Sequence, residues 1–194
     1  GIGPLSSPTC RRLSRLVANM TDLIGVRDNA SRDLLLEIGV RRPVHVAADP
    51  VFTFDAPAAA PAPATRPLVV VIPRYSLGHA QQQALADACD QLVEQHGAQI
   101  VLLPFQTGYA AKYDDLRSAE AIAGRMRHAT SASVHTPATT DETLALIGQA
   151  QLVISSRLHG LIFAAIQGVA GVAINYEVKV GSFMAEIGQA WACL

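Results

Sequence analysis

Residues 152–168 read LVISSRLHGLIFAAIQG, and this stretch decides the fold class. Its start, Leu152–Ser155, is a short apolar run typical of a buried strand. Its end, Leu158–Gln167, is an apolar segment with the length of a helix, and the glycine at 168 is a normal helix stop signal. We therefore predict a strand and a helix joined by a short turn, with Arg157 and His159 at the first turn of the helix.

The same alternation of strands and helices extends outward from this stretch. Leu68–Ile72 is a continuous apolar, β-branched run, as expected of a strand that is buried on both faces. Strands that alternate with helices predict an α/β fold with a parallel sheet covered on both sides. Further strands are predicted at Ile100–Leu103, Ser133–His135 and Gly171–Asn175, and helices at Ala80–His96, Ser118–His128, Asp141–Gln149 and Val180–Ile187.

Residues 56–67 read APAAAPAPATRP and divide the chain into two parts. A Pro/Ala composition without apolar periodicity is typical of a linker. We therefore predict an N-terminal part over residues 1–55 and a longer C-terminal part over residues 68–194. The N-terminal part shows β-α-β order, with a helix at Thr9–Asn19, a strand at Leu23–Val26, a helix at Arg32–Ile38 opened by Ser31, and a strand at Val44–Ala47.

The composition of the 194-residue chain excludes several classes of protein. Half of the residues are hydrophobic and 16% are charged, so the chain has ample apolar surface to bury and is not a disordered protein. A formal net charge of −1 argues against a nucleic-acid partner bound through bulk charge. Cys10, Cys89 and Cys193 are odd in number and far apart, which argues against a disulfide scaffold or a zinc knuckle. The longest apolar stretch, Leu161–Ile174, is too short and too interrupted for a transmembrane segment.

Several basic side chains directly follow predicted strands. In parallel sheets the carboxyl ends of the strands share one edge, and ligands bind outside it. A helix N-terminus there favours an anion, an arginine fork matches phosphate or carboxylate, and a histidine transfers protons near neutral pH. An alternative stays open, in which Arg157 pairs with a carboxylate and His159 is a structural imidazole. The polar residues that follow the strands are Arg27, Arg74, Arg157, His159, Tyr176 and Lys179.

Common signatures of other sites are missing from the sequence. No G-x-G-x-x-G follows a predicted strand, and neither a P-loop nor a G-x-S-x-G elbow occurs. The remaining histidines lack the spacing of metal ligands, so we predict no metal site. These observations disfavour a dinucleotide enzyme, a P-loop nucleotidase and an α/β-hydrolase.

Short motifs in a fixed order run along nearly the whole chain. Together they resemble the polysaccharide pyruvyl transferase family, most closely its CsaB-like branch. Two positions depart from the family's usual pattern, because Glu177-Val178 replaces a common Asp-Pro and Gly160 replaces a common alanine. The motifs are GIGPL at residues 1–5, GVRD at 25–28 with Ser31, ADPVF at 48–52, LLPF at 102–105, SRLHGLI at 156–162 and YEVKV at 176–180.

The resemblance implies a glycosyltransferase-B-like architecture of two Rossmann-like domains, here truncated at both ends. Residues 1–55 would be the remainder of the N-terminal domain, and residues 68–194 the donor-binding domain. The family's enzymes transfer a pyruvyl group from phosphoenolpyruvate to two hydroxyls of a sugar, forming a cyclic ketal and releasing phosphate. The implied acceptor is a lipid-linked or polysaccharide sugar, and in the CsaB-like branch the product anchors S-layer proteins to the cell wall. The implied location is cytoplasmic, with the inner face of the membrane as an alternative place of action.

The resemblance also assigns roles to residues at the sheet edge. Arg157 and Arg74 would hold phosphoenolpyruvate, with the backbone around Leu158 assisting them. His159 would be the acid–base residue or a phosphate ligand, and Lys179 a further contact. Arg157 and His159 would be the catalytic residues. The reaction would need no metal and no organic cofactor.

Two other functions remain open from the sequence. A nucleotide-sugar glycosyltransferase of the same fold would use this edge for a diphosphate, and it would release a nucleoside diphosphate in place of phosphate. A non-catalytic domain that binds anions or sugars would show binding without turnover.

Overall fold

A computed structural model describes residues 2–3, 5–54, 66–108 and 110–194 of the chain. Its largest element is a parallel sheet of five strands in the order β5-β4-β3-β6-β7. The first strand of this sheet along the chain, β3, lies in its centre. The next two strands, β4 and β5, lie on one side of β3, and β6 and β7 lie on the other side. The loops after β3 and β6 therefore diverge, and this is the place where open α/β sheets bind ligands. The strands are β3 (Leu68–Ile72), β4 (Gln99–Leu102), β5 (Ala132–Val134), β6 (Leu152–Ser155) and β7 (Ala170–Ala173).

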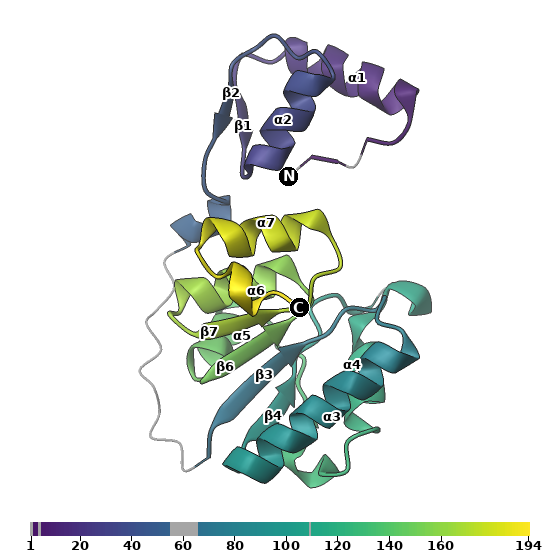
Figure 1. Ribbon diagram of the computed structural model, residues 1–194, viewed down its shortest axis with the longest axis vertical. Helices are drawn as coiled ribbons and strands as arrows, with labels where there is room; N and C mark the ends of the chain where they lie inside the picture. The colour runs from purple at the N-terminus through teal and green to yellow at the C-terminus, as the bar shows by residue number, and fades with distance from the viewer. Residues whose placement is uncertain (1, 4, 55–65, 109) are drawn as a thin grey trace.

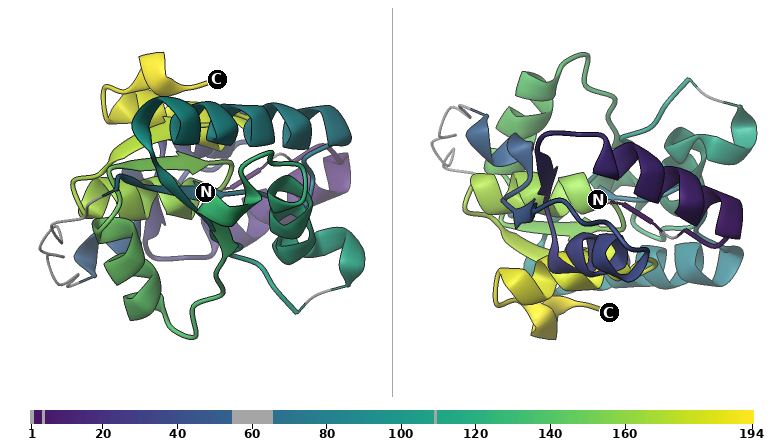
Figure 2. Two further views of the ribbon diagram at one scale, coloured as in Figure 1. Left: turned by 90° about the horizontal axis from the view of Figure 1, so that it is seen from below. Right: turned by 90° about the horizontal axis from the view of Figure 1, so that it is seen from above.

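Helices cover both faces of this sheet (Figure 2). Along β3, Val69 and Val71 pack in the cluster formed with α3 (His79–His96) and α4 (Asp115–Ala123). Val70 and Ile72 point the other way, into the cluster formed with α5 (Thr140–Gly148) and α6 (Leu158–Ile166). This two-sided burial explains the unbroken apolar run of β3 and confirms the predicted fold class. Helix α7 (Val178–Glu186) packs against α6.

The N-terminal elements lie at one end of the molecule, beside α7 (Figure 1). The parallel pair β1 (Ile24–Val26) and β2 (Val44–Val46) is accompanied by α1 (Pro8–Asn19) and α2 (Asn29–Glu37). A short 3-10 helix, Pro50–Thr53, then reaches the C-terminal part, where the Phe52 ring lies 6.4 Å from that of Phe183. The predicted linker lies outside the described residues from position 56 to 65, so the division into domains stays a prediction.

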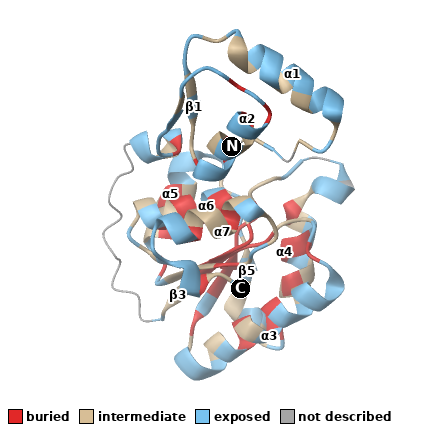
Figure 3. Ribbon diagram, turned by 45° about the horizontal axis from the view of Figure 1, so that its top comes forward, coloured by how far each residue is buried: buried red, intermediate tan, exposed pale blue. Residues whose placement is uncertain are grey.

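Burial is concentrated in the C-terminal part, as Figure 3 shows. Helix α1 contains no buried residue, and its apolar side chains Leu13, Leu16 and Val17 are exposed, as is Met20 directly after it. Within the described ranges, no helix combines the length and the apolar character that crossing a bilayer requires.

Two helix starts were predicted too late because aspartate caps place them earlier in the chain. The helix expected from Arg32 begins at Asn29, since the Asp28 carboxylate accepts a hydrogen bond from the backbone N of Ser31 at 2.6 Å. The helix expected at Ser118–His128 begins at Asp115, since the Asp114 side chain accepts a bond from the backbone N of Leu116. The predicted end of this helix is also wrong, because the helix ends at Ala123 with Gly124 as its C-cap. An aspartate before the first turn satisfies N–H groups that otherwise lack partners.

Candidate functional site

The turn between β6 and α6 is held by two buried serines. Ser155 Oγ accepts a hydrogen bond from Arg157 N at 3.0 Å and donates one to Arg157 O at 2.8 Å. Ser156 Oγ donates to the Ile72 carbonyl of the neighbouring strand. Arg157 is the N-cap residue of α6, and the helix start receives no side-chain cap. The serine hydroxyls therefore fix the backbone from which the Arg157 side chain extends.

The Arg157 guanidinium is paired with Asp115, the first residue of α4. Its Nε donates to Asp115 Oδ2 at 2.9 Å, and its Nη2 donates to Asp115 Oδ1 at 2.5 Å and to Gln106 Oε1 at 3.1 Å. Asp115 is fully buried, whereas 18% of the Arg157 side chain is exposed. The alternative in which Arg157 pairs with a carboxylate is therefore correct for one side of the guanidinium. The other side, Nη1, has no hydrogen-bond partner among the described residues, and Arg157 is one of the residues that line a pocket.

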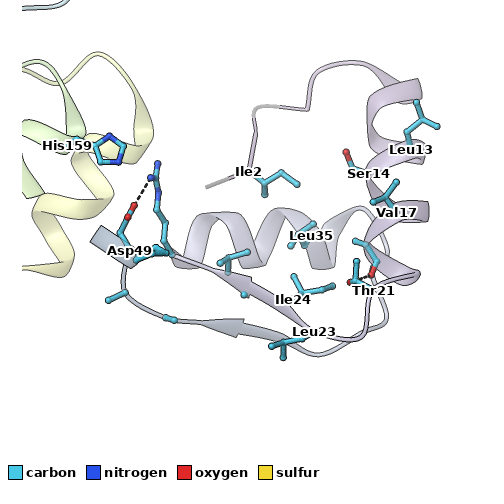
Figure 4. Close-up of a pocket in the computed structure, with 17 residues that line it drawn as sticks. Ile2, Leu13, Ser14, Val17, Thr21, Leu23, Ile24, Leu35, Asp49 and His159 are labelled. Carbon is cyan, nitrogen blue, oxygen red and sulfur yellow. Dashed lines mark hydrogen bonds and ion pairs between the residues drawn. The ribbon is translucent and has the colours of Figure 1, made fainter. Parts of the chain in front are cut away.

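His159 extends from the first turn of α6 toward Asp49 and the N-terminal elements (Figure 4). His159 is exposed to solvent. The protein around the ring still removes part of its hydration, and this effect lowers the pKa of His159. Asp49 acts in the opposite direction, while Arg27 and Lys179 lower the pKa further. The imidazole therefore favours its neutral form at neutral pH.

Glu177 joins Arg74 to Lys179. Its Oε1 accepts from Arg74 Nη1 at 2.7 Å, and its Oε2 lies 2.6 Å from Lys179 Nζ. Burial acts to raise the pKa of Glu177, but the interactions with Lys179 and Arg74 outweigh it, so the pKa is lowered. The Arg74 guanidinium also stacks on the Tyr176 ring, 4.1 Å from its centre, and bonds the Tyr75 hydroxyl. Its Nε is buried and finds no hydrogen-bond partner in the described part of the chain.

A pocket of about 490 Å³ opens at this edge of the sheet. The structure brings four of the predicted residues together on its wall, namely Arg157, Leu158, His159 and Lys179. Arg74 is not on this wall and stacks on the pocket residue Tyr176. Arg27, which follows β1, also lines the pocket, so residues of the N-terminal part contribute to it. The full lining comprises Arg27, Phe105, Gln106, Thr107, Arg157, Leu158, His159, Tyr176 and Lys179.

Each cation of the pocket has a carboxylate partner. Arg27 Nη1 lies 2.7 Å from Asp49 Oδ2, as Arg157 pairs with Asp115 and Lys179 with Glu177. Sequence reasoning placed the basic residues at this edge but missed these carboxylates and Gln106. The sequence contained only a weak indication of each aspartate. Asp115 follows the capping residue Asp114, and Asp49 comes three positions after the end of β2. In the part of the chain that the structure describes, no three His, Cys, Asp or Glu side chains gather as a metal site would require.

A sequence model described as polysaccharide pyruvyl transferase matches residues 1–178. The chain belongs to this family. The members of this family are transferase enzymes. The pocket with its basic side chains therefore belongs to a chain of a transferase family. No curated protein matches the chain's sequence.

Two solved structures show the fold at low sequence identity. The Thermobaculum terrenum O-GlcNAc transferase mutant K341M has a TM-score of 0.55 and 16% identity, over 78% of this chain and 31% of that one. A Listeria monocytogenes protein described as a UDP-N-acetylglucosamine 2-epimerase has a TM-score of 0.58 and 17% identity, over 89% of this chain and 46% of that one. Both support a Rossmann-like fold of the glycosyltransferase-B type. The chain spans about a third to a half of the length of these structures.

Proposed function

We propose that the protein transfers a pyruvyl group from phosphoenolpyruvate to a polysaccharide or lipid-linked sugar as a cyclic ketal, with release of phosphate. Family membership supports the reaction class, and one observation carries the donor: the pocket that brings Arg157, His159 and Lys179 together after β6 and β7. We assign donor binding to residues 68–194. The S-layer role and the cytoplasmic location, where phosphoenolpyruvate is made, belong to the same proposal.

The chemistry of phosphoenolpyruvate fits the wall of this pocket. The molecule carries a phosphate and a carboxylate, so it needs cationic donors in at least two places. Nη1 of Arg157 offers two N–H donors, and Lys179 and Arg27 present further positive charge on the same wall. Arg74 remains part of the proposal through Glu177, because the carboxylate that holds Lys179 also holds Arg74.

The reaction scheme begins with protonation of the methylene carbon of the donor. The oxocarbenium-like carbon that forms is stabilised by the carboxylate of the same molecule. A first sugar hydroxyl attacks this carbon and loses its proton, and the second hydroxyl then displaces phosphate and loses its own. Of the two protons released, one replaces the proton taken up by the methylene carbon and the other leaves with the phosphate. Because the pKa of His159 is lowered, its neutral ring suits the removal of a hydroxyl proton. The scheme requires neither a metal nor an organic cofactor.

The test is a calorimetric titration of phosphoenolpyruvate into the full-length protein and three variants. We expect Arg157→Ala to abolish binding and Lys179→Gln to weaken it. Lys112→Gln is the matched control, because Lys112 is the other lysine of the chain, is exposed over the Tyr113 ring and lies off the pocket wall. Unchanged binding in Arg157→Ala would refute the site.

Product analysis with an acceptor sugar tests the reaction itself. Release of inorganic phosphate together with a ketal on the sugar is the expected result. Release of a nucleoside diphosphate would assign the glycosyltransferase alternative. Binding of phosphoenolpyruvate without any turnover, in the full-length protein with its acceptor, would favour a binding domain.

A further inference from the structure

We infer that Asp115 is a positioning residue for donor binding, which fixes the Arg157 guanidinium so that its Nη1 edge faces the pocket. The inference rests on the proposed function, since it assigns Arg157 to the donor. It concerns a residue that does not itself line the pocket.

Asp115 connects the three loops that build the donor edge. Its Oδ1 accepts from the backbone N of Tyr75, after β3, and its Oδ2 accepts from the backbone N of Gln106, after β4, both at 2.9 Å. The two bonds from Arg157 come from the residue after β6. A carboxylate has about four acceptor positions, and all four are used here. The buried carboxylate is therefore saturated and has no capacity left for a ligand.

The bonding of Arg157 shows which edge is left for an anion. A guanidinium has five N–H donors. The Nε donor and the two on Nη2 are taken by Asp115 and by Gln106 Oε1. The two donors on Nη1 have no partner among the described residues. Asp115 thus determines both where the guanidinium lies and which of its donors remain free.

A role in stability alone does not explain this arrangement well. A buried ion pair gains little over apolar side chains of similar size, because removing both charges from water offsets their attraction. Among the described residues, Asp90 is a second aspartate that is fully buried, and it serves as a comparison. Asp90 of α3 is fully buried, accepts from the backbone N of Arg127 and of His128 at 2.9 Å each, and lies 3.3 Å from Arg127 Nε. It does so away from the pocket.

The experiment compares Asp115→Asn with Asp90→Asn in the full-length protein. Both changes remove a charge from a buried site of similar bonding, so both should lower the midpoint of urea unfolding. Only Asp115→Asn should weaken phosphoenolpyruvate binding, by about ten- to a hundredfold, as expected for a misplaced binding group. Equal affinities in wild type and Asp115→Asn, with normal folding, would overturn the inference.

A double-mutant cycle separates the positioning of Arg157 from the role of Asp115 in holding the loops after β3 and β4 together. Arg157→Lys keeps the charge but loses the planar fork, so Asp115→Asn should cost little further affinity in that background. Additive losses would overturn positioning. If Asp115→Asn does not fold, Asp115→Glu makes the test, because it keeps the charge and lengthens the side chain that holds Arg157. Affinity equal to that of the wild type would overturn positioning.

If the proposed function is wrong, the result is different, because the wild type then does not bind phosphoenolpyruvate. The same variants are then compared with inorganic phosphate as the probe of the Nη1 edge. Weakening of phosphate binding by Asp115→Asn but not by Asp90→Asn supports the positioning role, and equal binding overturns it.

Discussion

Replacing Gly160 by alanine should destabilise the protein, although alanine is the better helix former. Gly160 lies in the first turn of α6, directly above β6 and β3. A Cβ at this position would lie 2.5 Å from Ser155 Oγ, 2.6 Å from Ile72 Cδ1 and 3.3 Å from Ser155 Cβ. The first two distances are far shorter than any normal contact, so neighbouring atoms must move.

The magnitude follows from three effects. Alanine in place of glycine in a helix favours folding by about 1 kcal/mol. Overpacking of a buried site costs about 1–3 kcal/mol. The methyl of Ile72 can rotate away, but Ser155 Oγ holds two bonds to Arg157, and each such bond is worth about 1 kcal/mol. We therefore expect a net loss of about 1–3 kcal/mol in the free energy of unfolding.

Urea denaturation measures this loss, and Gly181→Ala in α7 provides the control. There the nearest atom to a new Cβ is Asn175 Nδ2 at 3.3 Å, so the helix preference should dominate and stability should not fall. Phosphoenolpyruvate affinity should drop in Gly160→Ala, because Ser155 positions the backbone of Arg157. Stability and affinity equal to those of the wild type would refute the reasoning. Relatives with alanine at this position would need smaller or shifted neighbours at the places of Ser155 and Ile72.

Two further predictions concern charges at the pocket. Glu177→Gln should tighten phosphoenolpyruvate binding by about 1.5- to fivefold, because Glu177 is 40% exposed and competes for Lys179 in a pair worth about 0.2–1 kcal/mol. Calorimetry at low and high salt measures the gain, and weaker binding would contradict it. The lowered pKa of His159 means that the unfolded chain binds its proton more readily, so stability should fall as the pH drops below the ordinary value of 6.5. Urea midpoints between about pH 7.5 and 5 should show a flatter decline in His159→Gln, and parallel curves in both proteins would argue against this cause.

Local patterns predicted the sheet well, for identifiable reasons. Leu68–Ile72 and Leu152–Ser155 have the bounds observed for β3 and β6, because runs buried on both faces are apolar throughout. Four predicted helix ends are followed by glycines with positive φ, at positions 39, 97, 168 and 188. The starts of α2 and α4 were misplaced, because Asp28 and Asp114 compete with nearby residues as caps and spacing does not rank them.

The candidate site was also predicted only in part. The sequence predicted that basic residues would meet at one edge of the sheet. This prediction needs only that the carboxyl ends of parallel strands lie at the same edge. The carboxylates that hold the arginines did not follow, because each is distant in sequence from its arginine. Asp115 is 42 positions from Arg157, and Asp49 is 22 from Arg27. Pairings of this kind depend on how loops pack, which periodicity does not encode.

The unequal burial of these carboxylates bears on how an anion enters the pocket. Asp115 is fully buried and the Asp49 side chain is 10% exposed, so moving either away from its arginine would leave a buried charge unpaired. Glu177 is 40% exposed, and water can solvate it if its partners leave. A donor anion should therefore bind with Arg157 and Arg27 unmoved and should displace Glu177 from Lys179. One side of the pocket is thus arranged before binding, and the other adjusts to the charge that arrives.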